Sequence, residues 1–551
     1  MLAAGNNDLL IQEIGQQLIR KDEVFNGRFP EYTENGIWQF RKNPNWLSGF
    51  IGGELWYLYE MTGEEEYKLR ALKHADQMID YATIDYTHDM GFIFMPTCVK
   101  SYQMTKDAKY RDAAIKAADM LVKRFNDKGQ YIRAWGKLNS NDEAGLMIID
   151  TIMNLELLFW AAQETGNYKY YEIAYRHALT AMKELVRPDG SSFHVVEFDP
   201  ESGQVLKKFT HQGFADSSTW SRGQAWGIYG FTLAYEYTQD ERFLKTAEIM
   251  ADYFIKHLPK DQVPYWDLSL SEEGTLRDAS AGAIAASGFF ELADVASKKQ
   301  EEQKYRRIAS DITSSLVNNY LFSQTSRRDE EGILLHTIYH FHKKWGVDES
   351  FPAGDYYLIE ALKRQWDLEQ FQRLDESNSA RQIINLNKNW YYLEEAIPYI
   401  NHLHLVAQEW EKINLPHTWN VTDATDNIPG YRRSTSWYQK EIFIPTLNYD
   451  QCLLLSFESV NISCIVLVNG QKVGEHVGGY LGFDVDITPF IKPNEKNIIL
   501  VKVDNSYNPD IIPSQKSDFF IYGGITRDVW LKVMPAEYIE KILITIPQVS
   551  K

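Results

Sequence analysis

Apolar residues recur every three or four positions in the part of the chain before residue 375, the spacing that places side chains on one face of an α-helix. This periodicity predicts about twelve helices. Their ranges are 7–22, 46–61, 64–82, 90–105, 108–124, 144–165, 168–186, 221–238, 241–257, 278–296, 301–320 and 353–366.

A short motif repeats where one predicted helix ends and the next begins. The first copy, Thr62–Ala71, has the form T-x4-Y-x3-A, and copies with Tyr or Phe follow at 105–114, 165–174 and 238–247. The aromatic residue and the alanine share one face of the second helix. Paired helices of this kind, about six in all, predict an (α/α)6 barrel of inner and outer helices, with an open helical solenoid as the alternative. The long polar and aromatic insertion at 187–220 favours the barrel, because functional residues usually lie on loops at one end of a rigid scaffold.

Beyond residue 375 the pattern changes to alternation of apolar and polar residues, which is typical of strands. The alternating segments are 437–444, 452–460, 462–468, 497–503 and 528–533, and turn signals such as Asn469-Gly470 separate them. We therefore predict a multidomain chain, all-α and then all-β. The expected domains are an (α/α)6-barrel catalytic domain at 1–374, a linker at 375–389 and a β-sandwich of the jelly-roll kind at 390–551.

Composition narrows the possible partners. There are 57 Lys and Arg against 76 Asp and Glu, a net charge of −19, which argues against nucleic acid and anionic membranes. The 3 cysteines are too few and too scattered for a disulfide framework or a metal site. We found no membrane-spanning apolar run and no signal peptide, so we expect a cytoplasmic or periplasmic protein. The oligomeric state stays open.

The segment 216–231 is the first candidate site. Ser221 is predicted to cap a helix, on which Arg222 and Trp226 are four residues apart and share a face. An arginine that binds a carboxylate beside a flat apolar ring suits an acidic sugar. The alternative is a buried helix start, in which Trp226 is plain core and Arg222 pairs with a structural aspartate.

A second candidate site centres on Asp150, a lone carboxylate in an apolar run. Burial would raise the pKa of this carboxyl towards the range that suits acid–base catalysis. His88-Asp89 precedes another predicted inner helix. The alternatives are a buried structural cap for Asp150 and a surface cap for Asp89. Aromatic and polar residues that could hold a sugar lie in loops or helix starts, and these are Trp46, Trp135, His194, Gln212 and Trp220.

Four motifs together resemble glycoside hydrolase family 88, the unsaturated glucuronyl hydrolases. They are HDMGF (88–92), the Asp150 helix, WSRGQAWGIYGF (220–231) and WGVDESFPAGDYYLIEAL (345–362). The resemblance implies an (α/α)6 barrel that needs no metal or other cofactor. It also implies a substrate that carries a 4,5-unsaturated uronic acid at its non-reducing end, as polysaccharide lyases leave it. The segment Ser350–Ala353 departs from the family pattern, which leaves the preferred leaving sugar open.

Carried over to this chain, the resemblance gives Asp150 the role of general acid and base and Asp89 that of a second essential carboxylate. Trp46 and Trp135 match residues that stack on the sugar. Pocket residues around the substrate carboxylate and the C4=C5 bond are matched by His88, His194, Gln212, Arg222 and Trp226, with Trp220 beside them. The implied reaction is hydration of C4=C5. An unsaturated rhamnogalacturonyl hydrolase and a non-catalytic glycan-binding protein are the alternatives.

The β-rich region resembles the sugar-binding jelly-roll domain of glycoside hydrolase family 2. The matching pieces include INLPHTWN (413–420), LVNGQKVGEHVGGY (467–480) and YGGITRDVWL (522–531). Such a domain would serve either as an accessory glycan-binding module or as a structural partner of the helical domain. The residues 544–551 resemble the start of a further module, so a longer parent protein is one interpretation.

Overall fold

The computed structural model describes residues 4–538 except 273, 297, 325–329, 377–380, 395–409, 422, 424–429, 445–450, 494 and 512–519. The chain forms two compact units, Met1–Trp366 and Asp367–Lys551. Each is considered by itself. The residues 544–551, which resemble a further module, lie outside the described residues.

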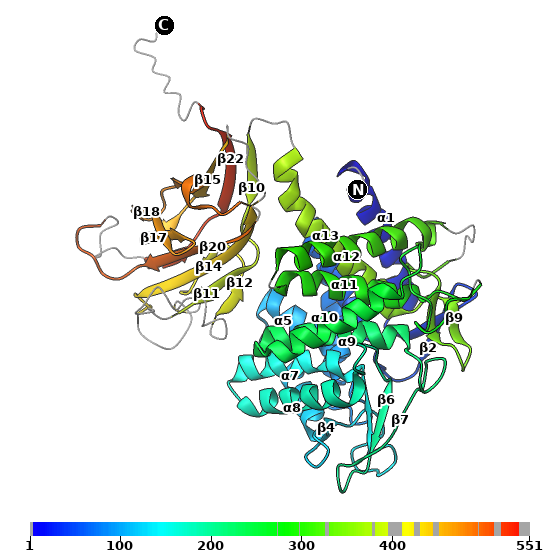
Figure 1. Cartoon of the computed structure of the whole chain (residues 1–551). Coiled ribbons are helices and arrows are strands. Elements are labelled where there is room, and N and C mark those ends of the chain that lie inside the picture. Colours follow the sequence, from blue (N-terminus) through cyan, green and yellow to red (C-terminus); the bar gives the residue numbers. More distant parts are fainter. Residues whose placement is uncertain are drawn as a thin grey trace, which may run out of the picture. The chain divides into compact units, whose positions relative to one another are not determined.

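Helices form the bulk of the first unit (Figure 1). They are α1 (Ala4–Phe25), α2 (Phe50–Thr62), α3 (Glu65–Ile79), α4 (Met90–Phe94), η1 (Met95–Val99), α5 (Lys100–Thr105), α6 (Ala108–Lys123), α7 (Thr151–Thr165), α8 (Tyr168–Leu185), α9 (Ser221–Thr238), α10 (Glu241–Lys256), α11 (Ala279–Val295), α12 (Lys299–Asn319), the short η2 (Phe322–Gln324) and α13 (Pro352–Glu376).

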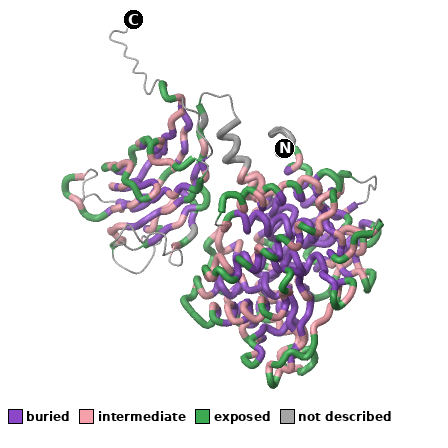
Figure 2. The backbone as a smooth tube through the Cα atoms, viewed as in Figure 1, coloured by how far each residue is buried: buried purple, intermediate pink, exposed green. Residues whose placement is uncertain are grey.

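The helices pack in pairs, such as α2 with α3 and α9 with α10. The first member of each pair is buried all round, as in α9 and α11, whereas the second, such as α10, buries one apolar stripe (Figure 2). Neighbouring inner helices also contact one another, from α2 through η1, α4, α7 and α9 to α11. The helix α13 joins α11 to α2, because Ser287 bonds the Tyr357 carbonyl and Tyr57 bonds Glu360. In the described residues the inner helices therefore form a closed ring.

Several predicted helices have different bounds in the structure. The range predicted as 90–105 is interrupted by the π-helix η1, whose Pro96 has no backbone N–H to donate. The helix predicted from 144 begins only at Thr151, because Leu146–Ile148 forms the strand β5 instead. Ser221 is not the cap of α9. Trp220 holds that position, and the Ser221 hydroxyl donates to the Trp266 carbonyl at 2.9 Å.

Short strands fill the connections that precede the inner helices. They are β1 (Phe29–Glu34), β2 (Ile37–Arg41), β3 (Phe125–Asn126), β4 (Tyr131–Ile132), β5 (Leu146–Ile148), β6 (Val195–Phe198), β7 (Val205–Phe209), β8 (Thr337–His340) and β9 (Trp345–Glu349). Their sheets are the antiparallel ladders β1–β2, β3–β4, β5–β6–β7 and β8–β9. They gather at one end of the unit (Figure 1).

The second unit is a sandwich of antiparallel sheets. One sheet has the order β10-β22-β15-β19, the second β12-β11-β14-β20-β17-β18, and a small third one β13-β21-β16. Both large sheets contribute to one apolar core, which includes Trp390, Leu453 and Val501. The strands are β10 (Gln382–Asn385), β11 (Trp390–Leu393), β12 (Glu411–Ile413), β13 (His417–Thr418), β14 (Thr435–Ile444), β15 (Gln451–Phe457), β16 (Val460–Asn461), β17 (Ser463–Val468), β18 (Gln471–Val477), β19 (Phe483–Asp486), β20 (Glu495–Asp504), β21 (Gly524–Ile525) and β22 (Val529–Pro535), with the one-turn helix η4 (Thr488–Phe490).

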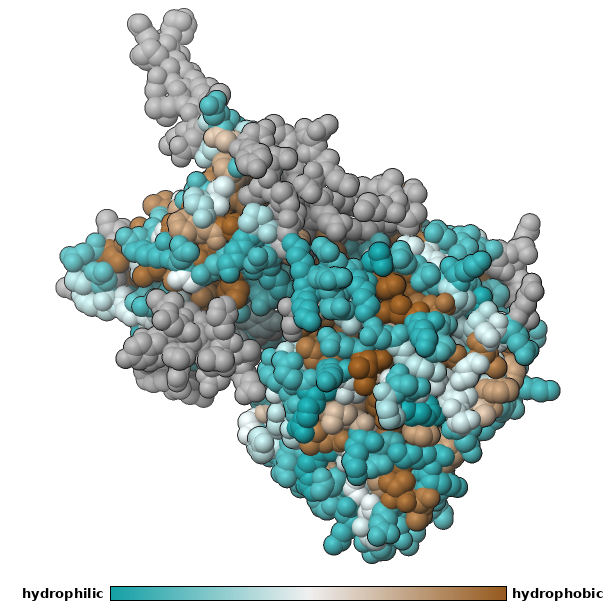
Figure 3. Space-filling view, viewed as in Figure 1, coloured by the Kyte–Doolittle hydropathy of each residue, from teal (hydrophilic) through white to brown (hydrophobic). Residues whose placement is uncertain are grey.

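The predicted linker at 375–389 is too long. The helix α13 continues to Glu376, and β10 already pairs with β22 from Gln382 onwards. The described surface in Figure 3 is mostly hydrophilic, with hydrophobic residues in separate patches. In the described parts of the chain, no helix has the length and apolarity needed to cross a membrane.

Candidate active site

A cavity of about 310 Å³ opens at the end of the helical unit that carries the short strands. Its walls come from the connections that lead into the inner helices α2, α4, α7, α9 and α13, and from the first turn of α9. The lining residues are Arg41, Pro44, Asn45, Trp46, Tyr86, Thr87, His88, Asp89, Trp135, Ile148, Asp150, His211, Gln212, Arg222, Tyr339, His340, Lys343 and Trp345. Segments far apart in the sequence thus meet at one site.

Asp150 immediately precedes α7, and it is held there because the Ile149 N–H bonds the His194 carbonyl at 3.1 Å. Although Asp150 occupies the N-cap position, its side chain makes no capping hydrogen bond. Its Oδ2 is buried and has no hydrogen-bond partner among the described residues, with His194 Nε2 4.0 Å away. Burial raises the pKa of Asp150 to about 7, against a smaller lowering by Arg222. Near neutral pH this carboxyl can both give and accept a proton.

Asp89 also lines the cavity, so it is not a surface cap. Burial raises the pKa of Asp89 to about 6, and a hydrogen bond from the Thr87 hydroxyl opposes the rise. His88 Nε2 lies 3.3 Å from Asp89 Oδ1, and its Nδ1 lies 2.8 Å from the Thr151 hydroxyl. Burial lowers the pKa of His88 to about 3, so the ring is neutral. His88 therefore connects Asp89 to the first residue of the Asp150 helix.

Aromatic rings form one wall of the cavity. Trp46 stacks on Tyr339 with 6.3 Å between ring centroids and 19° between planes, and Tyr339 stacks in turn on Trp345 at 6.5 Å. Trp135 lies beside His211, 5.4 Å between centroids. Such rings offer flat apolar surfaces of the kind that pack on the C–H face of a sugar.

Sequence reasoning missed several lining residues: Arg41, His211, Tyr339, His340, Lys343 and Trp345. Four of these belong to the β8–β9 hairpin. The run TIYHFHKKW at 337–345 is dense in aromatic, histidine and lysine residues. That density was the signal available in the sequence, but it carries no indication of which other segments the hairpin faces.

Arg222 lines the cavity but is otherwise buried. Its Nη1 pairs with Asp278 at 3.1 Å and donates to the Ile338 carbonyl at 2.5 Å, while Nη2 donates to the Tyr339 carbonyl at 2.8 Å. The pairing with a buried aspartate is the alternative considered for Arg222 from the sequence. Gln212, which also lines the cavity, donates to the same Tyr339 carbonyl at 2.7 Å.

Three predicted substrate residues lie behind the wall and are not among the cavity-lining residues. Trp226 has no exposed surface and contacts Trp46 and Phe92, because it lies a full turn into α9, within the core of the ring. His194 and Trp220 are also buried and stack on each other at 4.4 Å. These three support the residues that line the cavity.

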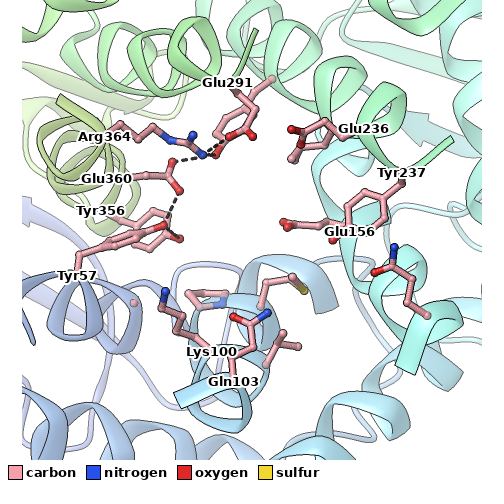
Figure 4. Close-up of a pocket in the computed structure, with 17 residues that line it drawn as sticks. Tyr57, Lys100, Gln103, Glu156, Glu236, Tyr237, Glu291, Tyr356, Glu360 and Arg364 are labelled. Atoms are coloured by element: carbon pink, nitrogen blue, oxygen red, sulfur yellow. Dashed lines mark hydrogen bonds and ion pairs between the residues drawn. The ribbon is translucent and has the colours of Figure 1, made fainter. Parts of the chain in front are cut away.

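A second cavity of about 340 Å³ lies among the inner helices and is lined mainly by their later turns (Figure 4). Glu156 points into it, and burial raises the pKa of this carboxyl to about 8. Glu360 accepts hydrogen bonds from Tyr57 and Tyr229, and Arg364 pairs with Glu291. The lining residues include no histidine or tryptophan. Its aromatic lining residues are all tyrosines.

No metal centre is evident in the part of the chain that the structure describes, since no three His, Cys, Asp or Glu residues are placed to hold an ion. The groups that line the first cavity include carboxyl, imidazole, guanidinium and aromatic side chains.

Comparisons with known proteins match the two units separately. Residues 21–358 match the profile described as Glycosyl Hydrolase Family 88, and residues 379–535 match that of Glycosyl hydrolases family 2, sugar binding domain. The chain is 38% identical over 374 residues to the "Unsaturated chondroitin disaccharide hydrolase" of Streptococcus pneumoniae, which covers 65% of this chain and 93% of that protein.

Further comparisons also match only one part of this chain each. The unsaturated glucuronyl hydrolase of Bacillus sp. GL1, whose crystal structure is described as that of an enzyme responsible for glycosaminoglycan degradation, has a TM-score of 0.60 and 34% identity, over 64% of this chain and 96% of that one. A "Putative beta-glucuronidase" of Formosa agariphila is 58% identical over 167 residues, which are 30% of this chain but only 20% of that protein.

Proposed function

The chain belongs to glycosyl hydrolase family 88, and from this premise we propose that it removes a 4,5-unsaturated uronic acid from the non-reducing end of lyase-generated oligosaccharides. The observation that carries the proposal is Asp150, a buried carboxyl with a free Oδ2 and a pKa near 7 inside an aromatic-walled cavity. A buried acid without a partner costs folding free energy, which is expected where the acid works on a substrate.

The cavity suits an acidic sugar. Arg41, Arg222 and Lys343 line it and supply positive charge within a chain of net charge −19. The charge of Arg222 acts on Asp150 and lowers its pKa, so we assign Arg222 to the uronate carboxylate. The sugar ring would then pack on the rings of Trp46 and Trp135. We assign His88 and Gln212 to polar contacts around the ring, and His194, Trp220 and Trp226 to the layer that holds these residues in place.

The reaction adds water across the C4=C5 bond. Protonated Asp150 gives its proton to C4, and the positive charge that develops is shared between C5 and the ring oxygen. The Asp150 carboxylate then takes a proton from a water molecule whose oxygen bonds to C5. The product is a hemiketal at C5, which opens and releases the leaving sugar. Asp150 ends the cycle protonated, so one carboxyl serves as acid and base in turn.

Asp89 has a different role in this proposal. Two carboxylates acting on opposite sides of a glycosidic bond are the rule in ordinary glycosidases, but here the double bond supplies the reactivity. Asp89 is ionised at a lower pH than Asp150 and interacts with it electrostatically. We assign it to holding sugar hydroxyls and to keeping Asp150 protonated in the resting enzyme.

We also assign a fold to each of the two units. The closed ring of paired helices supports an (α/α)6 barrel, and the two facing sheets support a jelly roll. The first unit is then the catalytic domain and the second a sugar-binding-type domain. The comparisons do not favour the two alternatives, an unsaturated rhamnogalacturonyl hydrolase and a non-catalytic glycan-binding protein.

The test is a direct assay. An unsaturated chondroitin disaccharide is incubated with the protein, and the ultraviolet absorbance of its C4=C5 bond is followed. We expect the absorbance to fall while the free hexosamine appears in equal amount. Retention of absorbance with this disaccharide and with heparin-, hyaluronan- and gellan-derived counterparts would contradict the proposal.

A further inference from the structure

Asp278, buried directly before α11, joins three elements around the cavity. Its Oδ2 pairs with Arg222 of α9 at 3.1 Å. Its Oδ1 accepts hydrogen bonds from the Ile338 N–H of β8 at 3.3 Å, the Ser280 N–H at 3.1 Å and the Ser280 hydroxyl at 2.5 Å. One carboxylate therefore connects α9, α11 and the β8–β9 hairpin.

Arg222 bonds the hairpin too, at Ile338 and at the next residue, Tyr339. Its two terminal nitrogens donate to the carbonyls of Ile338 and Tyr339, whereas Asp278 accepts the Ile338 N–H. The ring of Tyr339 is the one that stacks on Trp46 in the cavity wall. The ion pair thus determines where this wall lies relative to the start of α9.

We infer that Asp278 is a positioning residue for the proposed reaction, which fixes Arg222 and Tyr339 relative to Asp150 without lining the cavity itself. The inference rests on the proposed function. Asp240 is a helix cap that lies away from the cavity and so offers a comparison. It precedes the outer helix α10, accepts the Arg242 N–H and the Tyr175 hydroxyl, and pairs with Arg242 at 2.6 Å.

The pair also acts on Asp150 through its charge. The charged or titratable groups that act on Asp150 or lie near it are Arg222 from α9, Asp89 from the segment before α4 and His194 from the segment before β6, and Asp89 in turn has His88 at 3.3 Å. Arg222 lowers the pKa of Asp150, and Asp278 offsets part of the charge of Arg222. Loss of the Asp278 charge would leave a more positive field, which favours the ionised form of Asp150.

The experiment compares Asp278→Asn with the matched control Asp240→Asn by measuring kcat and KM on an unsaturated disaccharide across pH. For Asp278→Asn we expect kcat to fall about tenfold to a hundredfold. The alkaline limb of the kcat/KM profile, where Asp150 loses its proton, should move about one unit to lower pH. Asp240→Asn should leave both the rate and the limb unchanged and lower only the melting temperature.

Asp278→Asn leaves Arg222 as an uncompensated buried charge, which can prevent folding. The double variant Asp278→Asn/Arg222→Gln has no such charge. With Arg222 removed, the limb of the double variant should move to higher pH, opposite to the single variant. If every variant that folds keeps the alkaline limb of its kcat/KM profile at the wild-type pH, the inference is overturned. Wild-type protein without turnover would instead overturn the proposed function, so the two failures are distinguishable.

Discussion

Among the described residues, the two units of this protein differ in the buried acids that they contain. In the described part of the sandwich, the fully buried polar residues include the amides Asn420, Asn497 and Asn505. Each amide donates to a backbone carbonyl, as Asn505 does to that of Ile521 at 3.0 Å. The helical unit buries amides too, but in addition it buries acids, among them Asp278 and Asp355. The amides of the sandwich thus satisfy buried backbone groups with side chains that do not titrate.

Acids are costlier to bury than amides, so each buried acid calls for a partner or a reaction. Asp355 has Lys21 at 2.6 Å, and Asp278 has Arg222 at 3.1 Å. Asp150 has no hydrogen bond to its Oδ2 among the described residues. The comparison separates acids that hold the fold together from the one that has a free oxygen in the cavity.

The largest expected effect comes from Asp150→Asn. We expect kcat to fall about 10²–10⁴-fold, because proton transfer is lost while the shape of the site is kept. At pH 8 the variant should melt at a higher temperature than the wild type. Burial raises the pKa of Asp150 from 3.8 to about 7, so the ionised acid destabilises the fold increasingly as pH rises through that range. Kinetics and calorimetry measure the two effects.

Glu156→Gln is the matched control, since Glu156 lines the second cavity and its pKa is raised to about 8. This variant should keep the wild-type kcat and also gain stability at alkaline pH. If Glu156→Gln lost as much activity as Asp150→Asn, acids in both cavities would matter to the reaction. Asp150 would then not differ in function from the other buried acids.

The pH profile of the wild type is the second prediction. Catalysis needs Asp150 protonated and Asp89 ionised, and their pKa values are about 7 and about 6. We therefore expect kcat/KM to be highest between these values and to fall about tenfold for each pH unit above the upper limb. In Asp150→Asn the upper limb should disappear from the residual activity. An upper limb that persists in that variant would assign it to another group.

Arg222→Lys should have a smaller effect, a fall in kcat/KM of about tenfold. A lysine keeps the charge but cannot pair with Asp278 and bond the Ile338 and Tyr339 carbonyls at the same time. The KM for the unsaturated disaccharide should rise more than kcat falls. An unchanged kcat/KM would mean that neither the fork of hydrogen bonds nor its position matters to the substrate.

Local patterns predicted the helices well, and tertiary contacts account for what they missed. The helix at 221–238 has the predicted bounds, because its apolar period ends at the repeated threonine turn. Trp226 and Arg222 do share a face, but that face points into the ring, so Trp226 is buried instead of forming a plate in the cavity. The roles of Tyr339 and Asp278 depend on segments that meet only in the folded chain. The strand β10 falls within the predicted linker because its four residues are too few to show a period.

The smallest expected effect is that of removing the sandwich, in a chain that ends at Glu376, the last residue of α13. Every residue that lines the first cavity precedes Trp366, where the helical unit ends. We therefore expect kcat/KM on disaccharides to stay within about twofold of that of the full chain. A twofold change corresponds to less than about 0.5 kcal/mol. Rates on the disaccharide and on longer oligosaccharides, with a melting curve for each protein, measure the result. If the shortened protein is folded and as active on disaccharides but slower on longer chains, the sandwich binds glycan. If it is folded but inactive, the sandwich contributes to the site, and the division between an acid-burying catalytic unit and an amide-stabilised accessory unit is wrong. If it only loses thermal stability, the sandwich is a structural partner of the helical unit.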